Sequence, residues 1–238
     1  MSGPTALDFL LFAVLPYLSI VSCFGIGYLR YRTRPYTYSS LSSQFLENKQ
    51  HFWGLMPFHY GIIVVLLGHL VAFLIPREII AWNSKPVRLY VLEISALVFG
   101  LLALIGLVAG IVRRLSHAHL RRVTTWPDWI LFLILTVQIS TGIGVAVFHP
   151  WGSSWYATTA VPYLRSLLLM NPQIAALSVM PLLVKAHITC AFLLIGFFPF
   201  TRLVHVFSIP NSYLWRRPQV VRWYGRVPRT VQKGVGES

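Results

Sequence analysis

Five apolar stretches, each long enough to cross a bilayer, constrain this chain most strongly. They run from about Leu7 to Leu29, Leu55 to Ile75, Leu89 to Val112, just after Pro127 to Phe148, and Leu182 to Phe207. A helix needs about 20 residues to cross the hydrocarbon core. Backbone groups in lipid must be paired within their own segment. We therefore expect an all-α integral membrane bundle of five transmembrane helices.

The composition agrees with a chain that mostly avoids water. Only 11% of the 238 residues are charged, whereas a soluble domain carries about 25%. The net charge of +14 raises the question of nucleic-acid binding. Lys and Arg, however, fall in the loops between the apolar stretches, as in the cytoplasmic loops of membrane proteins. We expect membrane lipid around the chain and no nucleic-acid partner.

The distribution of basic residues predicts the orientation. Fifteen Lys and Arg lie after the first and third stretches or from Arg202 of the fifth onward, and five lie on the other side, after the second and fourth stretches or at the start of the fifth, which accounts for all 20. The side with more basic residues is the cytoplasmic one. We expect the N-terminus outside and the C-terminus in the cytoplasm of a bacterial or archaeal cell. Residues 1–210 would form the membrane domain, and residues 211–238 a basic cytoplasmic tail able to dock a redox partner.

Other segments predict a surface feature and exclude several kinds of site. The stretch from His149 to Val179 is rich in Trp and Tyr, Tyr163 among them, which suits a helix lying at the outer interface. Cys23 and Cys190 lie inside apolar segments, and no C-x-x-C spacing occurs. This excludes a zinc ribbon, an iron–sulfur site and covalently attached haem. Phosphate-loop and dinucleotide motifs are also absent from the sequence.

Four of the eight histidines lie within predicted spans. His59 and His69 fall in the second, and His187 and His205 in the fifth. Ionisable residues in membranes are costly and suggest function, and imidazole is a good ligand for haem iron. A single such histidine is more often hydrogen-bonded within a bundle. Two pairs on two helices favour two haem b groups, each held between two histidines.

Topology predicts how these histidines pair. His59 and His69 are ten residues apart, roughly 15 Å along a helix, and His187 and His205 are eighteen apart, about 27 Å and five turns. The two helices run in opposite directions. His69 and His187 would therefore bind the outer iron, and His59 and His205 the inner iron. The unequal separations need tilt or a bend at Pro199.

Residues near these histidines could accommodate a macrocycle and its propionates. Gly61, Gly68 and Gly196 would give a flat group room, or would serve close helix packing. Basic or hydrogen-bonding side chains near the predicted haems are candidate propionate partners, or simply snorkelling charges. They are Arg114, Arg202 and Tyr28 at the inner haem, and Lys185 and Arg88 at the outer haem.

At this point the sequence resembles a known family. The words that carry the likeness, in order, are Ser42-Ser43-Gln44, Phe58-His59-Tyr60-Gly61-Ile62, Gly68-His69, Arg113-Arg114-Leu115, Thr124-Thr125, Pro199-Phe200-Thr201-Arg202-Leu203-Val204-His205, Ser208-Ile209-Pro210, Tyr213-Leu214 and Gln219-Val220-Val221-Arg222. They look like the gamma subunit, the cytochrome b, of membrane-bound respiratory nitrate reductase. The likeness covers roughly residues 7 to 224, and the histidine spacing with its flanking words is specific.

The resemblance implies two b haems and oxidation of a quinol, menaquinol or ubiquinol, near the outer haem. It implies electron transfer through the inner haem to an iron–sulfur subunit and a molybdenum subunit that reduces nitrate. The family has a lysine at the start of the third helix, where Arg88 stands here, with Lys85 one turn earlier. Gly68 leaves space beside His69. Glu93, inside the third span, would be a proton acceptor or a structural partner of a cation.

Two other interpretations remain open at this point. The chain could be the cytochrome b anchor of another quinone-linked redox complex, which co-purifying subunits would reveal. It could instead be a haem-free proton channel or transporter whose histidines relay protons. Reduced-haem absorption at the b-type bands separates the haem-containing interpretations from the haem-free one.

Overall fold

The computed structural model of the chain describes residues 4–33 and 51–206, and every regular element within these ranges is helical. Five stretches are long and apolar enough to cross a membrane: Ala6–Thr33, Met56–Leu74, Pro86–Ser116, Trp126–Phe148 and Leu182–Phe200. The prediction of an all-α bundle with five spans is therefore confirmed. The predicted tail, residues 211–238, lies outside the described residues.

The first span is one helical run that includes two π-turns. It consists of α1 (Ala6–Phe9), η1 (Leu10–Val14), α2 (Leu15–Val21), η2 (Ser22–Ile26) and α3 (Gly27–Thr33). The other long helices are α4 (His51–Leu74), α6 (Pro86–Ser116), α8 (Trp126–Phe148) and α12 (Leu182–Phe197). Short helices α5 (Pro76–Asn83) and α7 (Ala118–Arg122) connect them. Helices α5 and α6 both begin at a proline, whose missing N–H costs nothing at that position.

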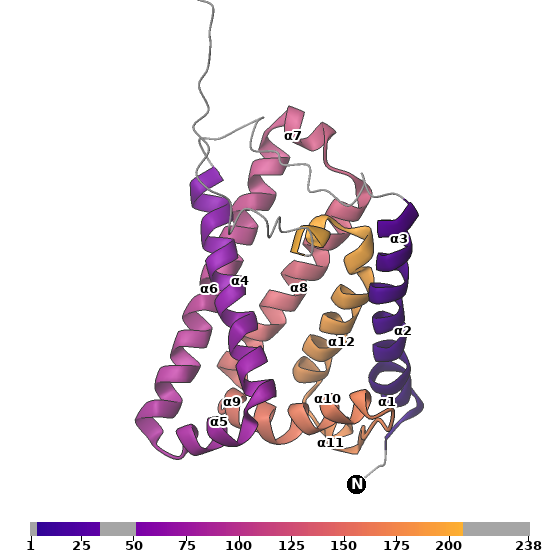
Figure 1. Ribbon diagram of the computed structural model, residues 1–238. Helices are drawn as coiled ribbons and strands as arrows, with labels where there is room; N and C mark the ends of the chain where they lie inside the picture. The colour runs from indigo at the N-terminus through magenta and orange to yellow at the C-terminus, as the bar shows by residue number, and fades with distance from the viewer. Residues whose placement is uncertain (1–3, 34–50, 207–238) are drawn as a thin grey trace, which may run out of the picture. The chain divides into compact units, whose positions relative to one another are not determined.

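The long helices pack side by side as a row, with the first span beside the last (Figure 1). Helix α4 packs on α6, α6 on α8, α8 on α12, and α12 on α2. In the described part of the chain, α4 and α12 share no extensive contact, and they run in opposite directions. A buried cluster between α6 and α8, called here the central cluster, holds the middle of the row together. Its members are Ala103, Leu107, Leu131, Leu135 and Ile139.

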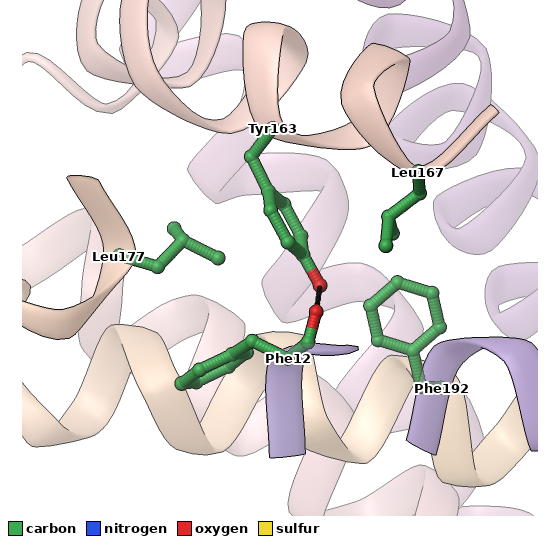
Figure 2. Packing of buried hydrophobic residues seen from close by; sticks show 5 residues of the cluster. All are labelled: Phe12, Tyr163, Leu167, Leu177 and Phe192. Carbon is green, nitrogen blue, oxygen red and sulfur yellow. Dashed lines mark hydrogen bonds between the residues drawn. The ribbon is translucent and has the colours of Figure 1, made fainter. Parts of the chain in front are cut away.

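Several short helices gather at the end of the bundle where the chain begins, called here the short-helix end (Figure 1). They are α5, α9 (Gly152–Trp155), η5 (Tyr156–Ala160), α10 (Val161–Leu168) and α11 (Ala175–Ser178). A single interfacial helix was expected here. The structure instead buries Tyr163, which is 1% exposed, in a cluster with Phe12, Leu177 and other apolar side chains. Figure 2 shows the Tyr163 hydroxyl donating a hydrogen bond to the Phe12 carbonyl oxygen at 2.8 Å.

The fifth span does not continue as one helix to Phe207. Helix α12 ends at Phe197, a 3₁₀ turn follows (η6, Phe198–Phe200), and Thr201 has extended backbone before a second 3₁₀ segment (η7, Arg202–Val206). Pro199 cannot donate a helical hydrogen bond, which favours the break. His205 therefore lies in η7 and not on α12, so the five turns of continuous helix expected between His187 and His205 do not occur.

Two of the three glycines expected to make room for a macrocycle serve helix packing instead. A Cβ on Gly61 would lie 2.5 Å from the backbone nitrogen of Ala103 in α6. A Cβ on Gly196 would lie 3.1 Å from the hydroxyl of Ser19 in α2. Helices α6 and α2 already occupy the space beside Gly61 and Gly196. Only Gly68, of these three, has open space where a Cβ would stand.

Candidate functional site

Two of the four histidines lie at the short-helix end, on two separate helices. His69 lies in the last turns of α4, and His187 lies in the first turns of α12. Because these helices are antiparallel, both positions fall at the same end of the bundle (Figure 1). The two imidazoles lie close enough to interact electrostatically. The structure thus brings together the residues expected to form the outer pair.

Both rings have the tautomer that a metal ligand needs. His69 Nδ1 is 2.8 Å from the Val65 carbonyl oxygen, and His187 Nδ1 is 3.1 Å from that of Gln138. A carbonyl oxygen can only accept, so Nδ1 carries the proton, and in the neutral ring Nε2 keeps its lone pair. Metal-ligating histidines commonly donate their other N–H in this way. His117 makes the same contact within its own helix, so the distinguishing feature is that His69 and His187 come from separate helices.

The π-turn η5 reaches His69 through Tyr156. The Tyr156 hydroxyl donates to the His69 carbonyl oxygen at 3.3 Å, and the two rings meet edge to face with centroids 5.2 Å apart. Burial raises the pKa of Tyr156, so its hydroxyl remains a donor at physiological pH. Tyr156 was expected only as an interfacial aromatic.

The segments carrying the other two histidines converge on the central cluster. Partly buried His59 lies on α4, with its ring edge to face against Phe58 at 5.4 Å. His205 lies in η7, and its side chain is outside the described part of the chain. Phe58 and Leu203, close neighbours of the two histidines along the chain, both pack on the central cluster.

Two of the expected propionate partners form ion pairs within the protein. Lys185 Nζ lies 2.9 Å from Asp8 Oδ1, and Arg202 Nε lies 3.0 Å from Asp128 Oδ1. Each aspartate also closes a capping box with the threonine three residues earlier, at the start of its own helix. Any propionate at these places would share Lys185 or Arg202 with a carboxylate.

Two further propionate candidates, Arg114 and Tyr28, lie at the opposite end of the bundle. Arg114 donates to the Thr124 hydroxyl at 2.9 Å, and its guanidinium lies 5.2 Å from the ring centroid of Phe132. Arg114 is close enough to Asp128 to interact with it electrostatically. Tyr28 is exposed on α3. Arg114 therefore belongs to a mixed-charge cluster, and Tyr28 faces outward.

The residues expected at a quinol site all lie near the short-helix end. Gly68 adjoins His69 and has open space beside it. Arg88, in the first turn of α6, is exposed and lies over the Trp82 ring at 5.2 Å from its centroid. Lys85, also exposed, occupies the N-cap position of α6. These cationic side chains therefore remain accessible to a ligand that enters from the surrounding membrane.

Glu93 faces the start of α9 rather than a neighbouring cation. Its Oε1 accepts hydrogen bonds from the Ser153 backbone N–H at 2.8 Å and from the Ser153 hydroxyl at 2.5 Å. The Asn83 amide donates to the hydroxyls of Ser153 and Ser154, both at 2.9 Å. Asn83 Oδ1 is buried and has no hydrogen-bond partner among the described residues. This polar group connects α5, α6 and α9.

Sequence reasoning missed the polar residues of α8 that surround His187. Thr141 Oγ1 lies 3.2 Å from His187 Nδ1, and the Gln138 amide nitrogen lies 3.3 Å from His187 Nε2. Gly142 packs directly against the ring. The available signal was the presence of a glutamine and a threonine inside an apolar span, where polar residues are costly.

Comparisons with known proteins agree with one another. A family profile described as nitrate reductase gamma subunit matches residues 8–224. The chain is 31% identical to the nitrate reductase gamma chain of Bacillus subtilis (strain 168), over 90% of this chain and 97% of that protein. It is 32% identical to the respiratory nitrate reductase 2 gamma chain of Escherichia coli (strain K12), over 91% and 97%. The nitrate reductase-like protein NarX of Mycobacterium tuberculosis (strain ATCC 25618 / H37Rv) is 29% identical, over 87% of this chain and 32% of that protein.

Proposed function

The chain belongs to the nitrate reductase gamma subunit family, and we propose that it is a dihaem cytochrome b that oxidises a membrane quinol. As a family member it is an oxidoreductase subunit and a multi-pass protein of the cytoplasmic membrane, with nitrate reduction on partner subunits. The observation that carries the proposal is that His69 and His187, on separate helices, lie at the same end of the bundle close enough to interact electrostatically, each with Nδ1 at a carbonyl oxygen.

The arrangement of α4 and α12 fits a flat group held between histidines. The two helices share no extensive packing in the part of the chain described. Of the α4 residues whose burial is described, only Gly61 and Ala72 are buried. His69 and His187 would hold the outer haem. Bound haem iron exchanges single electrons, which lets a two-electron quinol feed a one-electron acceptor.

The inner pair would be His59 with His205. The packing of Phe58 and Leu203 on the central cluster supports this pairing. Arg114, Arg202 and Tyr28 would supply donors for inner propionates, and Lys185 would do so at the outer haem. Lys185 and Arg202 would keep their aspartate partners, so their main contribution would be a fixed positive charge.

Quinol would bind beside His69, at the short-helix end. Gly68 leaves open space there, and Arg88 with Lys85 would orient a quinol oxygen. Glu93 would accept a proton released by oxidation, exchanging its hydrogen bond with the Ser153 hydroxyl for a bound proton. Because Glu93 also holds the Ser153 backbone N–H, proton transfer would affect the start of α9.

The proposed orientation places the short-helix end outside and the opposite end in the cytoplasm. Seven described arginines at the opposite end support it by the positive-inside rule. They are Arg30, Arg32, Arg113, Arg114, Arg121, Arg122 and Arg202. Electrons would leave at that end for an iron–sulfur subunit and a molybdenum subunit, the tail 211–238 assisting docking.

The test is haem content in the complete complex with single histidine substitutions. His69→Ala and His187→Ala should each remove the outer haem, and His59→Ala and His205→Ala the inner one. His149→Ala is the matched control, since this histidine lies at the end of α8 outside the proposed pairs. Redox titration of the b-type absorption counts the haems. Retention of both haems in all four variants would overturn the assignment.

A further inference from the structure

Helix α8 contacts the His187 ring through three of its residues, Gln138, Thr141 and Gly142. We infer that Gln138, Thr141 and Gly142 are positioning residues that fix the His187 ring and set its electron donation to the outer iron. The inference rests on the proposed function, because it requires a haem at His187. It assigns a specific task to a helix that carries no haem ligand itself.

Two acceptors on α8 hold the protonated nitrogen of His187. Nδ1 lies 3.1 Å from the Gln138 carbonyl oxygen and 3.2 Å from Thr141 Oγ1. The Thr141 hydroxyl hydrogen is directed to carbonyl oxygens of its own helix, 2.7 Å away at Val137 and 3.0 Å at Gln138. The hydroxyl oxygen is therefore left with lone pairs facing Nδ1–H. Hydrogen bonds of this kind make the ring a stronger donor to a metal at Nε2.

The missing side chain of Gly142 sets the position of the ring. A Cβ at this residue would lie 2.9 Å from His187 Cε1 and 3.4 Å from Nδ1. Carbon atoms in contact are normally about 3.5–4.0 Å apart. Any larger residue would therefore push the imidazole away from α8 and from both of its acceptors. Gly142 is required by the ring itself and not by a neighbouring backbone.

The Gln138 side chain identifies the direction in which His187 presents its lone pair. The amide nitrogen can only donate, and it lies 3.3 Å from His187 Nε2. Gln138 Oε1 is buried and has no hydrogen-bond partner among the described residues. A buried amide with one unsatisfied end is costly, which fits a side chain that turns aside when a metal takes the Nε2 lone pair.

The two proposed ligands of the outer iron differ in the helix to which their Nδ1–H donates. His69 bonds to Val65 of its own helix, an arrangement available to any helical histidine. His187 bonds to a different helix through both a carbonyl and a hydroxyl. Changes on α8 should therefore alter the outer haem through His187 alone and leave the inner haem unchanged.

The test uses Thr141→Val, which keeps the shape and removes the acceptor, and Thr141→Ser, which restores it. The complete complex in membranes is examined by redox titration and by electron paramagnetic resonance of the ferric haems. The outer haem is identified as the one that His187→Ala removes. Thr141→Val should raise the outer midpoint potential, because a less electron-rich ligand stabilises the ferric state less. Thr141→Ser should return it toward the wild-type value.

Two glycine substitutions on α8 test whether the lack of a side chain at Gly142 positions the His187 ring. Gly142→Ala should shift the outer haem signal or abolish it. Gly144→Ala, on the same helix, has the movable side chain of Leu183 as its nearest neighbour at 3.0 Å and should leave the signal unchanged. If Thr141→Val and Gly142→Ala both leave the outer potential and signal at wild-type values, the inference is wrong. A wild-type complex without b-type haem would instead overturn the proposed function.

Discussion

The ion pair between Asp128 and Arg202 connects the start of α8 to the segment that carries His205. Arg202 also donates to the Val123 carbonyl oxygen at 3.0 Å. We predict that Asp128→Asn loosens η7 and weakens retention of the inner haem. An amide oxygen can still accept the hydrogen bonds that Thr125 makes to this side chain, so the substitution removes the charge and largely spares the helix cap.

The expected magnitude follows from the burial of the pair. The Asp128 side chain is 6% exposed and that of Arg202 is 26% exposed. Neutralising one partner of a fully buried pair costs about 3–5 kcal/mol, and exposed pairs contribute about 0–1 kcal/mol. Because Arg202 is only partly buried, we expect a loss of about 2 kcal/mol. That corresponds to roughly a thirtyfold change in the equilibrium holding η7 on α8.

The assay is the fraction of each haem retained as the purified complex is warmed, read from b-type absorption. Asp128→Asn should release the inner haem at a lower temperature than the wild type, with the outer haem little changed. The matched control is Asp8→Asn, which removes the pair with Lys185 beside His187 and should affect the outer haem instead. Identical loss of both haems in both variants would refute the reasoning, because it would indicate a general effect on the bundle.

Two further predictions concern the short-helix end. The Glu93→Gln side chain can still accept the hydrogen bond from the Ser153 backbone N–H but cannot take a proton, so quinol-driven haem reduction should slow in a pH-dependent way. Arg88→Ala should slow haem reduction and weaken inhibition by quinol analogues. Wild-type rates in both variants would place the quinol site elsewhere. Tyr163→Phe removes the bond to the Phe12 carbonyl and should lower stability by about 1 kcal/mol without changing haem reduction. Burial raises the pKa of Tyr163, so the loss of stability in Tyr163→Phe should be constant up to pH 10. A thermal denaturation midpoint equal to that of the wild type would contradict this prediction.

Hydropathy was sufficient to predict the five spans because membrane insertion depends mainly on length and apolar composition. The third span, expected from Leu89 to Val112, extends over Pro86–Ser116. Hydropathy did not predict the end of α12, since apolar side chains continue beyond Phe197 at Phe198, Phe200, Leu203 and Val204. Pro199 was the one local signal for the break.

Long-range pairing was the part that the sequence could not predict. Lys185 and Asp8 are 177 residues apart, and no local pattern relates them. Lys185 was therefore interpreted by its proximity to His187 alone. The threonine and aspartate of each capping box do form a recognisable local motif. That motif could have identified Asp8 and Asp128 as cap residues but was not used for this, and only the fold shows that each also holds a cation close in sequence to a histidine.

The break after α12 bears on the unequal histidine separations. On a continuous helix, His205 would lie about 27 Å from His187, against roughly 15 Å between His59 and His69. The structure ends α12 at Phe197, gives Thr201 an extended backbone, and packs Leu203 on the central cluster, on which Phe58 of α4 also packs. The segments that carry His59 and His205 therefore share this cluster, and η7 must be held in place by its own contacts. This makes the Asp128 pair a local determinant of the inner site.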